Sequence, residues 1–236
     1  MVKGFLISLF SLTVVSLQAQ KKTLTKADAT VIVKKINAGV LDSRNYSATL
    51  NYQIFKLHTD TIPFQSLEGF YRRSGNNEHS MLTGIETIQN SEIRFVIDTA
   101  NESASVAAPS VKPQLVEASL EEALSLCKKI THEKLKNHSV LTLFPDQKSN
   151  TGFSSMEIAY DHSKNLIISI TICYTGSIIP GFEDIKNPKI TITYTNVSTS
   201  KVLSSEFDTG KYLEKMNKIY SLKQPYRHFT LINQLN

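Results

Sequence analysis

The sequence predicts a mainly β fold with helices, of the α+β class, in which an antiparallel sheet packs on helices. The first observation is alternation: apolar side chains occupy every second position in the segments 46–54, 166–174 and 190–195, with hydroxyl or polar side chains between most of them. The second is a pair of segments in which apolar residues recur at helical spacing. One face of the sheet is therefore expected to be apolar and covered, while the other meets water.

The first residues have the pattern of a secretory signal peptide. Lys3 provides a positive start, residues 5–17 form a short apolar run, and we expect cleavage after Ala19. The run is shorter than the ~20 residues that a membrane-spanning helix needs, so no stable membrane span is predicted. We therefore expect residues 1–19 to be removed and residues 20–236 to form a single domain that is periplasmic or secreted.

The N-terminal half is predicted to contain one helix and a run of strands. The helix covers 25–40, because Ala27, Val31, Ile32, Lys35 and Ile36 follow helical spacing and Gly39 is a typical end residue. Turn-forming residues then separate segments that alternate in the manner of strands. These segments predict strands at 46–58, 64–73, 81–89, 93–97 and 104–107.

The C-terminal half begins with a second helix. Ser119 and Glu122 form a capping box, and the apolar stripe through Leu120 and Cys127 predicts a helix that continues to about residue 137. Alternation resumes after this helix. The remaining predicted elements are strands at 140–144, 154–160, 166–175, 189–195 and 226–232, with one helical turn at 212–218.

The two cysteines are expected to remain unpaired, although an oxidising compartment permits a disulfide. Cys127 belongs to the apolar stripe of the second helix, while Cys173 lies on the polar side of its strand. If that helix packs on the apolar face, the two sulfur atoms lie on opposite sides of the sheet. The sequence therefore favours two free thiols and leaves a disulfide as the alternative.

The charge of the chain gives little indication of a polyanionic partner. The formal net charge is +5 at pH 7, and nucleic-acid binding would require a basic stripe. The nearest candidate is the set of basic residues between 201 and 227, which we interpret as a solvated face. A weak contact with anionic lipid or an acidic partner is the alternative, and no nucleic-acid partner is predicted.

No pattern typical of catalysis, cofactor binding or metal binding occurs in the sequence. The G-x-S-x-G, P-loop, G-x-G-x-x-G and H-E-x-x-H motifs are all absent. The histidines are scattered, and the closest pair, His132 and His138, does not align on one face of a helix. We therefore predict a protein that is not an enzyme, with no catalytic residue, cofactor or metal.

The order of the predicted elements, and several short segments within them, are similar to those of a known family. The segments are Gly69-Phe70-Tyr71-Arg72, 88–98, Leu143-Phe144-Pro145, Ile158-Ala159-Tyr160-Asp161, 189–197 and Ser205-Glu206-Phe207-Asp208. Over most of the chain after residue 19 they resemble the periplasmic outer-membrane lipoprotein carriers, the LolA-like family. The resemblance implies an incomplete antiparallel β-barrel, or half-barrel, that curves around two helices.

The resemblance also implies a carrier whose apolar inner surface binds lipid or lipoprotein acyl chains. Arg72 is expected at the rim of that surface, and the protein is expected to be a monomer. The same residues would equally form a closed core, in which case the chain would be a structural or assembly protein of the cell envelope, with envelope proteins as partners. The residues expected to line the apolar surface are Leu50, Tyr52, Ile54, Phe70, Phe95, Leu120, Leu124, Ile168, Ile170 and Ile192.

Overall fold

The structure is a computed structural model, and it describes residues 21–41, 43–110, 117–146, 152–176, 185–217 and 219–235. The predicted signal peptide, residues 1–19, lies outside the described residues. Among the described residues, no helix is both long enough and apolar enough to cross a membrane.

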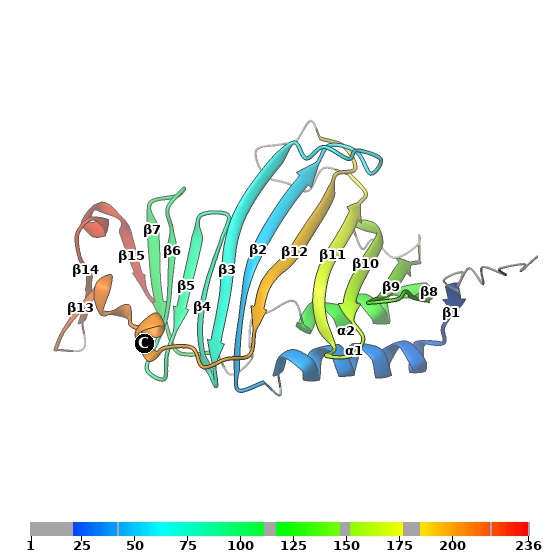
Figure 1. The fold of residues 1–236 in the computed structure, drawn as a ribbon. Helices are drawn as coiled ribbons and strands as arrows, with labels where there is room; N and C mark the ends of the chain where they lie inside the picture. The colour runs from blue at the N-terminus through cyan, green and yellow to red at the C-terminus, as the bar shows by residue number, and fades with distance from the viewer. Residues whose placement is uncertain are drawn as a thin grey trace, which may run out of the picture.

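Thirteen strands among the described residues form one curved sheet that does not close into a barrel (Figure 1). Neighbouring strands are antiparallel, except that β15 lies parallel to β7. The prediction of a mainly β fold with a curved antiparallel sheet is confirmed. In order across the sheet, the strands are β1 (Lys21–Thr23), β8 (Cys127–Lys134), β9 (Ser139–Pro145), β10 (Phe153–Asp161), β11 (Leu166–Tyr174), β12 (Lys189–Ser198), β2 (Asn45–Phe55), β3 (Gln65–Ser74), β4 (Asn77–Leu82), β5 (Ile85–Gln89), β6 (Arg94–Asp98), β7 (Ser103–Ala107) and β15 (Thr230–Asn233).

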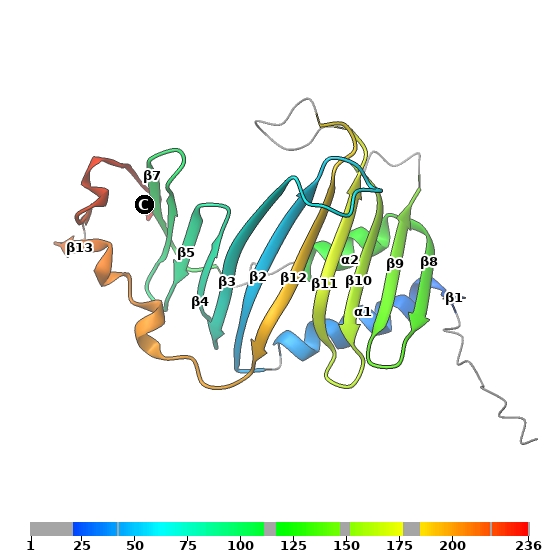
Figure 2. The same ribbon diagram turned by 45° about the horizontal axis from the view of Figure 1, so that its top comes forward.

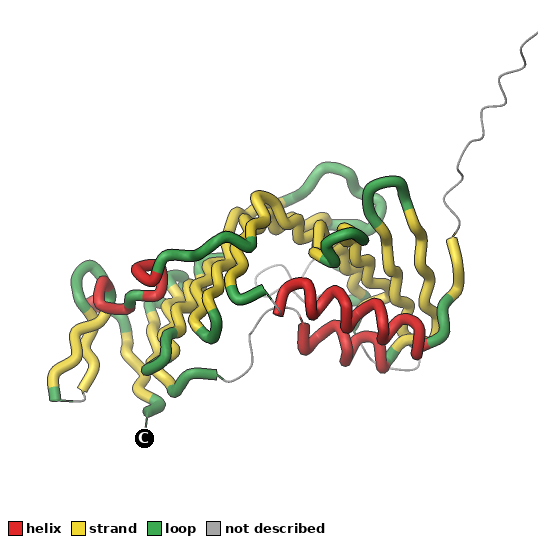
Figure 3. Tube along the Cα trace, turned by 60° about the horizontal axis from the view of Figure 1, so that its bottom comes forward, coloured by secondary structure: helices red, strands yellow, loops and turns green. Residues whose placement is uncertain are grey.

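Two helices, α1 (Lys26–Leu41) and α2 (Glu117–Ser125), lie side by side on one face of the sheet, which we call the inner face (Figure 2 and Figure 3). At the start of α1, Thr25 Oγ1 accepts a hydrogen bond from the Asp28 amide at 3.2 Å and donates one to Asp28 Oδ2 at 2.7 Å. This pair satisfies a free amide of the first helical turn. Near the other end Gly39 permits close packing, because a Cβ there would lie 2.5 Å from a backbone oxygen of the β10–β11 turn.

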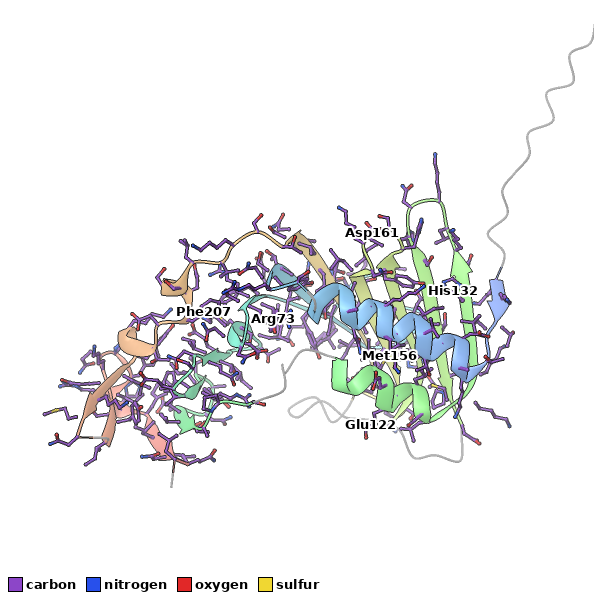
Figure 4. The ribbon with its side chains drawn as sticks, turned by 90° about the horizontal axis from the view of Figure 1, so that it is seen from below. Arg73, Glu122, His132, Met156, Asp161 and Phe207 are labelled. Carbon is purple, nitrogen blue, oxygen red and sulfur yellow. The ribbon has the colours of Figure 1, made fainter. Side chains whose placement is uncertain are left out.

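The side chains between the helices and the inner face form the larger of two apolar cores, the helix-side core. Ile36 of α1, Leu120 of α2 and Leu141 and Ile158 of the sheet have no exposed surface. Figure 4 shows both helices crossing the strands, with Met156 of this core beside them. The buried members are Ala29, Val33, Ile36, Tyr46, Ala48, Leu50, Tyr71, Leu120, Ala123, Leu124, Cys127, Ile130, Leu141, Leu143, Met156, Ile158, Tyr160, Ile167, Ile170 and Tyr194.

A second apolar core, the C-terminal core, lies under residues 201–235, which we call the C-terminal segment. This segment leaves β12, forms a hairpin of β13 (Leu213–Met216) and β14 (Ile219–Leu222), and ends in β15 beside β7 (Figure 1). Short 3-10 turns connect these strands. They span Ser204–Phe207, Thr209–Lys211 and Tyr226–His228. The buried members of the C-terminal core are Ile88, Ile93, Phe95, Ile97, Ala104, Val106, Tyr212, Leu213 and Leu222.

The strand register places the two cores on opposite faces of the sheet. Tyr71 of β3 belongs to the helix-side core, so its neighbour Arg72 lies on the outer face. Arg72 is the register partner of His79 in β4. His79 is in turn the partner of Ile88 in β5, and Ile88 is the partner of Phe95 in β6. Ile88 and Phe95 therefore also lie on the outer face, and both belong to the C-terminal core. The apolar side of the sheet changes from inner to outer between β3 and β4.

The second helix is much shorter than predicted, because it ends at Ser125 and the strand β8 follows. A bulge between Cys127 and Lys129 places one extra residue in β8. Cys127 and Ile130 can then both enter the helix-side core although they are three residues apart, a spacing that resembles a helical stripe in the sequence. Cys127 and Cys173 are both free, in agreement with the prediction.

Two shorter predictions are also wrong. The strand predicted at 81–89 is a hairpin, because Thr83 and Gly84 adopt φ angles of 54° and 83° and reverse the chain between β4 and β5. The helical turn predicted at 212–218 is instead the strand β13, which pairs with β14. The helix predicted at 25–40 is confirmed as α1.

Candidate functional site

Five of the residues predicted to line the apolar surface are buried on the inner side of the sheet. Leu120 and Leu124 project from α2, and Leu50 and Ile170 meet them from β2 and β11 within the helix-side core. Ile54 lies on the same face of β2 as Leu50 and is also buried. The sequence therefore identified one apolar surface that the helices and the sheet share.

The apolar inner face also carries a set of five half-buried side chains at the border of the helix-side core, which we call the inner margin; Ile172 and Ile192 among them pack against that core. Tyr52 of β2 is the register partner of Ile192 in β12 and of Leu67 in β3. Ile172 and Tyr174 follow on the same face of β11, and all five side chains are half-buried. Burial, together with the nearby Tyr174, raises the pKa of Tyr52 to about 12. Burial also raises the pKa of Tyr174, so both tyrosine hydroxyls are protonated at neutral pH.

Two aromatic residues predicted for this surface lie on the outer face instead. In β3 the inner positions belong to Gly69 and Tyr71, so Phe70 faces outward, where its ring meets the His79 ring edge-on at 4.7 Å between centroids. Phe95 has no exposed surface and belongs to the C-terminal core. Alternation within a strand shows which residues share a face, but it does not show which face that is.

Ile168 also departs from the prediction, because β11 contains a bulge. Ile167 pairs with Tyr160 and Ser169 pairs with Ala159, which leaves Ile168 as the extra residue. Ile167 consequently takes the buried position in the helix-side core, and Ile168 is 37% exposed.

Arg72, predicted at the rim of the inner surface, belongs to a polar cluster on the outer face. Its guanidinium forms an ion pair with Glu206 of the C-terminal segment. Nearby, Glu86 Oε1 lies 2.7 Å from His79 Nε2 and accepts a 2.6 Å hydrogen bond from the hydroxyl of Tyr212. The cluster links β3, β4 and β5 to the C-terminal segment. No sequence pattern indicated it, because Glu206 and Tyr212 are more than 100 residues from their partners Arg72 and Glu86.

The described residues contain no arrangement typical of a metal or redox centre. Among them, no group of three or more His, Cys, Asp or Glu residues could hold a metal ion. The Cys127 thiol donates to the carbonyl oxygen of Ala123 at 3.0 Å, and burial raises its pKa to about 11, so it is protonated and unreactive. His132 Nε2 lies 3.0 Å from the hydroxyl of Tyr160, and burial lowers the pKa of that imidazole. Apolar contact is the chemistry that the inner face offers.

Comparison with known proteins gives structural likeness without sequence likeness. No protein-family model matches the chain, and no curated protein matches it. An uncharacterized conserved protein from Thermus thermophilus is similar in structure at 8% identity and a TM-score of 0.45, over 88% of this chain and 99% of that chain. A LolA superfamily protein from Nitrosomonas europaea has 9% identity and a TM-score of 0.32, over 77% and 98%.

A third similar structure is a putative outer membrane lipoprotein-sorting protein domain from Vibrio parahaemolyticus. It has 9% identity and a TM-score of 0.32, over 79% of this chain and 98% of that chain. The superfamily that the sequence resembles is thus among the structures similar to this chain. TM-scores below 0.5 mark a distant likeness, so the function has to be argued from the residues of this chain.

Proposed function

We propose that the chain is a periplasmic or secreted carrier that binds lipid or lipoprotein acyl chains on the inner face of its sheet. The observation that carries the proposal is the inner margin. Ile158 and Ile170 at the centre of the helix-side core have no exposed surface, whereas the inner margin is half-buried, although its Ile172 and Ile192 also pack against that core. The inner margin thus keeps apolar surface within reach of a ligand, and apolar surfaces with few polar groups are typical of lipid sites.

In this mechanism an acyl chain lies along the inner margin and extends toward α2. Each buried methylene group contributes ~0.8 kcal/mol, so even a partly enclosed chain binds usefully. Leu120 and Leu124 pack against the sheet in the empty protein, and the nine-residue α2 moves aside when the ligand enters. The protonated hydroxyls of Tyr52 and Tyr174 would donate hydrogen bonds to the ester carbonyl at the end of the chain.

The predicted signal peptide, residues 1–19, supports a location outside the cytoplasm. A carrier of this kind would act as a monomer that shields acyl chains in transit. The alternative function, a structural or assembly protein of the envelope, would need only the closed cores. It predicts a reproducible envelope partner and no bound lipid.

A matched pair of substitutions in β12 tests the proposal. Ile192→Asn puts an amide on the inner margin, while Thr193→Asn puts the same group on the outer face one residue along. We expect Ile192→Asn to weaken displacement of an apolar fluorescent probe by about ten-fold, and Thr193→Asn to leave it unchanged. Circular dichroism confirms that both variants are folded. Equal binding by the two variants would contradict the proposal.

Native mass spectrometry of the protein purified from its own envelope gives an independent test. We expect a population whose added mass corresponds to a lipid or an acylated peptide, and which Ile192→Asn reduces. Neither a co-purified lipid nor probe binding would be found if the envelope-assembly function is correct.

A further inference from the structure

The C-terminal segment carries an exposed apolar pair that neither core uses. Met216 of β13 and Ile219 of β14 are register partners beside the turn of the hairpin, and they are 65% and 68% exposed. At the other end of the same hairpin, Leu213 and Leu222 are buried in the C-terminal core. The hairpin is therefore anchored at one end, while its tip holds two large apolar side chains in water.

The hairpin that carries this tip is basic: Lys215 directly precedes Met216, while Lys211 and Lys223 flank the buried end formed by Leu213 and Leu222. Between residues 211 and 227 the sequence contains four Lys and one Arg, and Glu214 is the single acidic residue. Lys211 and Lys215 each lie over a neighbouring tyrosine ring, which keeps their ammonium groups beside the hairpin. Lys215 also pairs with Glu92 at 3.1 Å, but both side chains are at least half exposed, so water and salt screen this pair.

We propose that the tip of the β13–β14 hairpin docks the protein onto a membrane surface that contains anionic lipid. Met216 and Ile219 would enter the boundary between head groups and acyl chains, while Lys215, one residue before Met216, remains at the level of the phosphates. Lys211, Lys223 and Arg227, at the anchored end of the hairpin, would add attraction to the anionic surface over a longer distance. Peripheral proteins bind membranes through this combination of apolar and basic side chains. The proposal goes beyond the carrier function and does not depend on whether the inner face binds an acyl chain.

A second exposed apolar site on the chain provides the control. Ile62, in the connection between β2 and β3, is 82% exposed. The formal charges of that connection balance, because residues 56–64 contain one Lys and one Asp. Figure 1 shows the connection at the top of the sheet, away from the hairpin at the left end. Ile62 is therefore an exposed apolar side chain without surrounding positive charge, and it can be compared with Met216 and Ile219 on the basic hairpin.

The chain contains no tryptophan, so one introduced tryptophan reports on one position. Met216→Trp and Ile62→Trp are prepared in the chain after residue 19 and mixed with vesicles of phosphatidylcholine, with or without phosphatidylglycerol. We expect the emission of Met216→Trp to shift to shorter wavelength only with phosphatidylglycerol, and to return when salt is added. The proposal would be overturned if the emission of Ile62→Trp shifted and that of Met216→Trp did not. It would also be overturned if the emission of Met216→Trp shifted equally with neutral vesicles.

Vesicle co-sedimentation measures the affinity without a reporter. Ile219→Ser should weaken binding to the anionic vesicles about ten-fold, whereas Ile62→Ser should bind as the unmodified chain does. Both positions lie outside the cores, and circular dichroism checks that the variants remain folded. Undiminished binding by Ile219→Ser overturns the proposal. Absence of binding to either vesicle also overturns it.

Discussion

The two cores of this sheet are closed by different kinds of contact. Two helices close the helix-side core with apolar side chains, and its central residues, such as Ile158, have no exposed surface. Phe95 at the centre of the C-terminal core is equally buried. The C-terminal segment that covers this core, however, is also held by the hydrogen bonds of His79, Glu86 and Tyr212. One continuous sheet thus supports one closure made mainly by apolar packing and another that also depends on an ionised carboxylate.

The largest expected effect comes from the centre of the C-terminal core. Phe95→Ala should lower the free energy of unfolding by about 3–5 kcal/mol, because it leaves a cavity among fully buried neighbours. Val96→Ala, one residue along on the other face, should cost less than about 1.5 kcal/mol. Urea denaturation measures both values.

We expect a single unfolding transition, because the ladder between β3 and β4 joins the two cores. Two separate transitions would show that the cores fold independently.

The next effect concerns Gly69 in β3, beside the point where the apolar face changes. A Cβ at this position would lie 2.2 Å from the backbone oxygen of Met81, so Gly69→Ala forces the two strands apart. We expect a loss of about 1–3 kcal/mol in thermal unfolding. The control is Gly75→Asn in the following turn, where φ is 60° and no atom lies within 4 Å of an added Cβ. Similar losses in both variants would contradict a steric cause.

The hydrogen bonds that hold the C-terminal segment over the C-terminal core are expected to make a contribution of similar size. Glu86→Gln weakens two hydrogen bonds to a charged acceptor, so we expect a loss of about 1–3 kcal/mol at neutral pH. Glu92→Gln is the control, because its pair with Lys215 is exposed and should contribute less than about 1 kcal/mol. Chemical denaturation distinguishes the two. A Glu86→Gln variant as stable as the unmodified chain would show that the cluster does not hold the C-terminal segment.

The smallest expected effect is the loss, on acidification, of the stability that the Glu86 carboxylate contributes. Burial alone would raise the pKa of Glu86, but hydrogen bonds from His79 and Tyr212 outweigh burial and lower that pKa. A lowered pKa contributes stability that is present above the ordinary value of about 4.3 and is lost as the pH falls through the folded value. The difference between the unmodified chain and Glu86→Gln should therefore shrink below about pH 4. Denaturation curves at several pH values test this, and a widening difference would contradict it.

The strands could be predicted because alternation is a local property of the sequence. Two bulges limited what alternation could assign. The bulge in β8 brought Cys127 and Ile130 to the same face, and the bulge in β11 placed Ile167, and not Ile168, in the buried position. No local pattern indicated that Phe95 belongs to a different core from Leu50. That difference depends on which residues pair across the sheet, and pairing between distant strands leaves no short-range pattern.

The polar cluster was unpredictable for the same reason. Glu206 and Tyr212 reach residues of β3 and β5 that precede them by more than 100 positions. The basic residues of this region are evident in the sequence, but nothing there indicates that Leu213 and Leu222 beside them are buried. A segment with the composition of a solvated face therefore serves as the cover of a core.

The two edges of the sheet have a consequence for how the protein behaves at high concentration. An open sheet exposes unpaired backbone groups at its outermost strands, and these groups can recruit the edge of another molecule. Here the edges are β1, three residues long with Lys21 and Lys22, and β15, four residues long. Short strands and lysines make poor templates for further pairing. The broad sheet is thus protected against growing into fibres by the two shortest strands it contains.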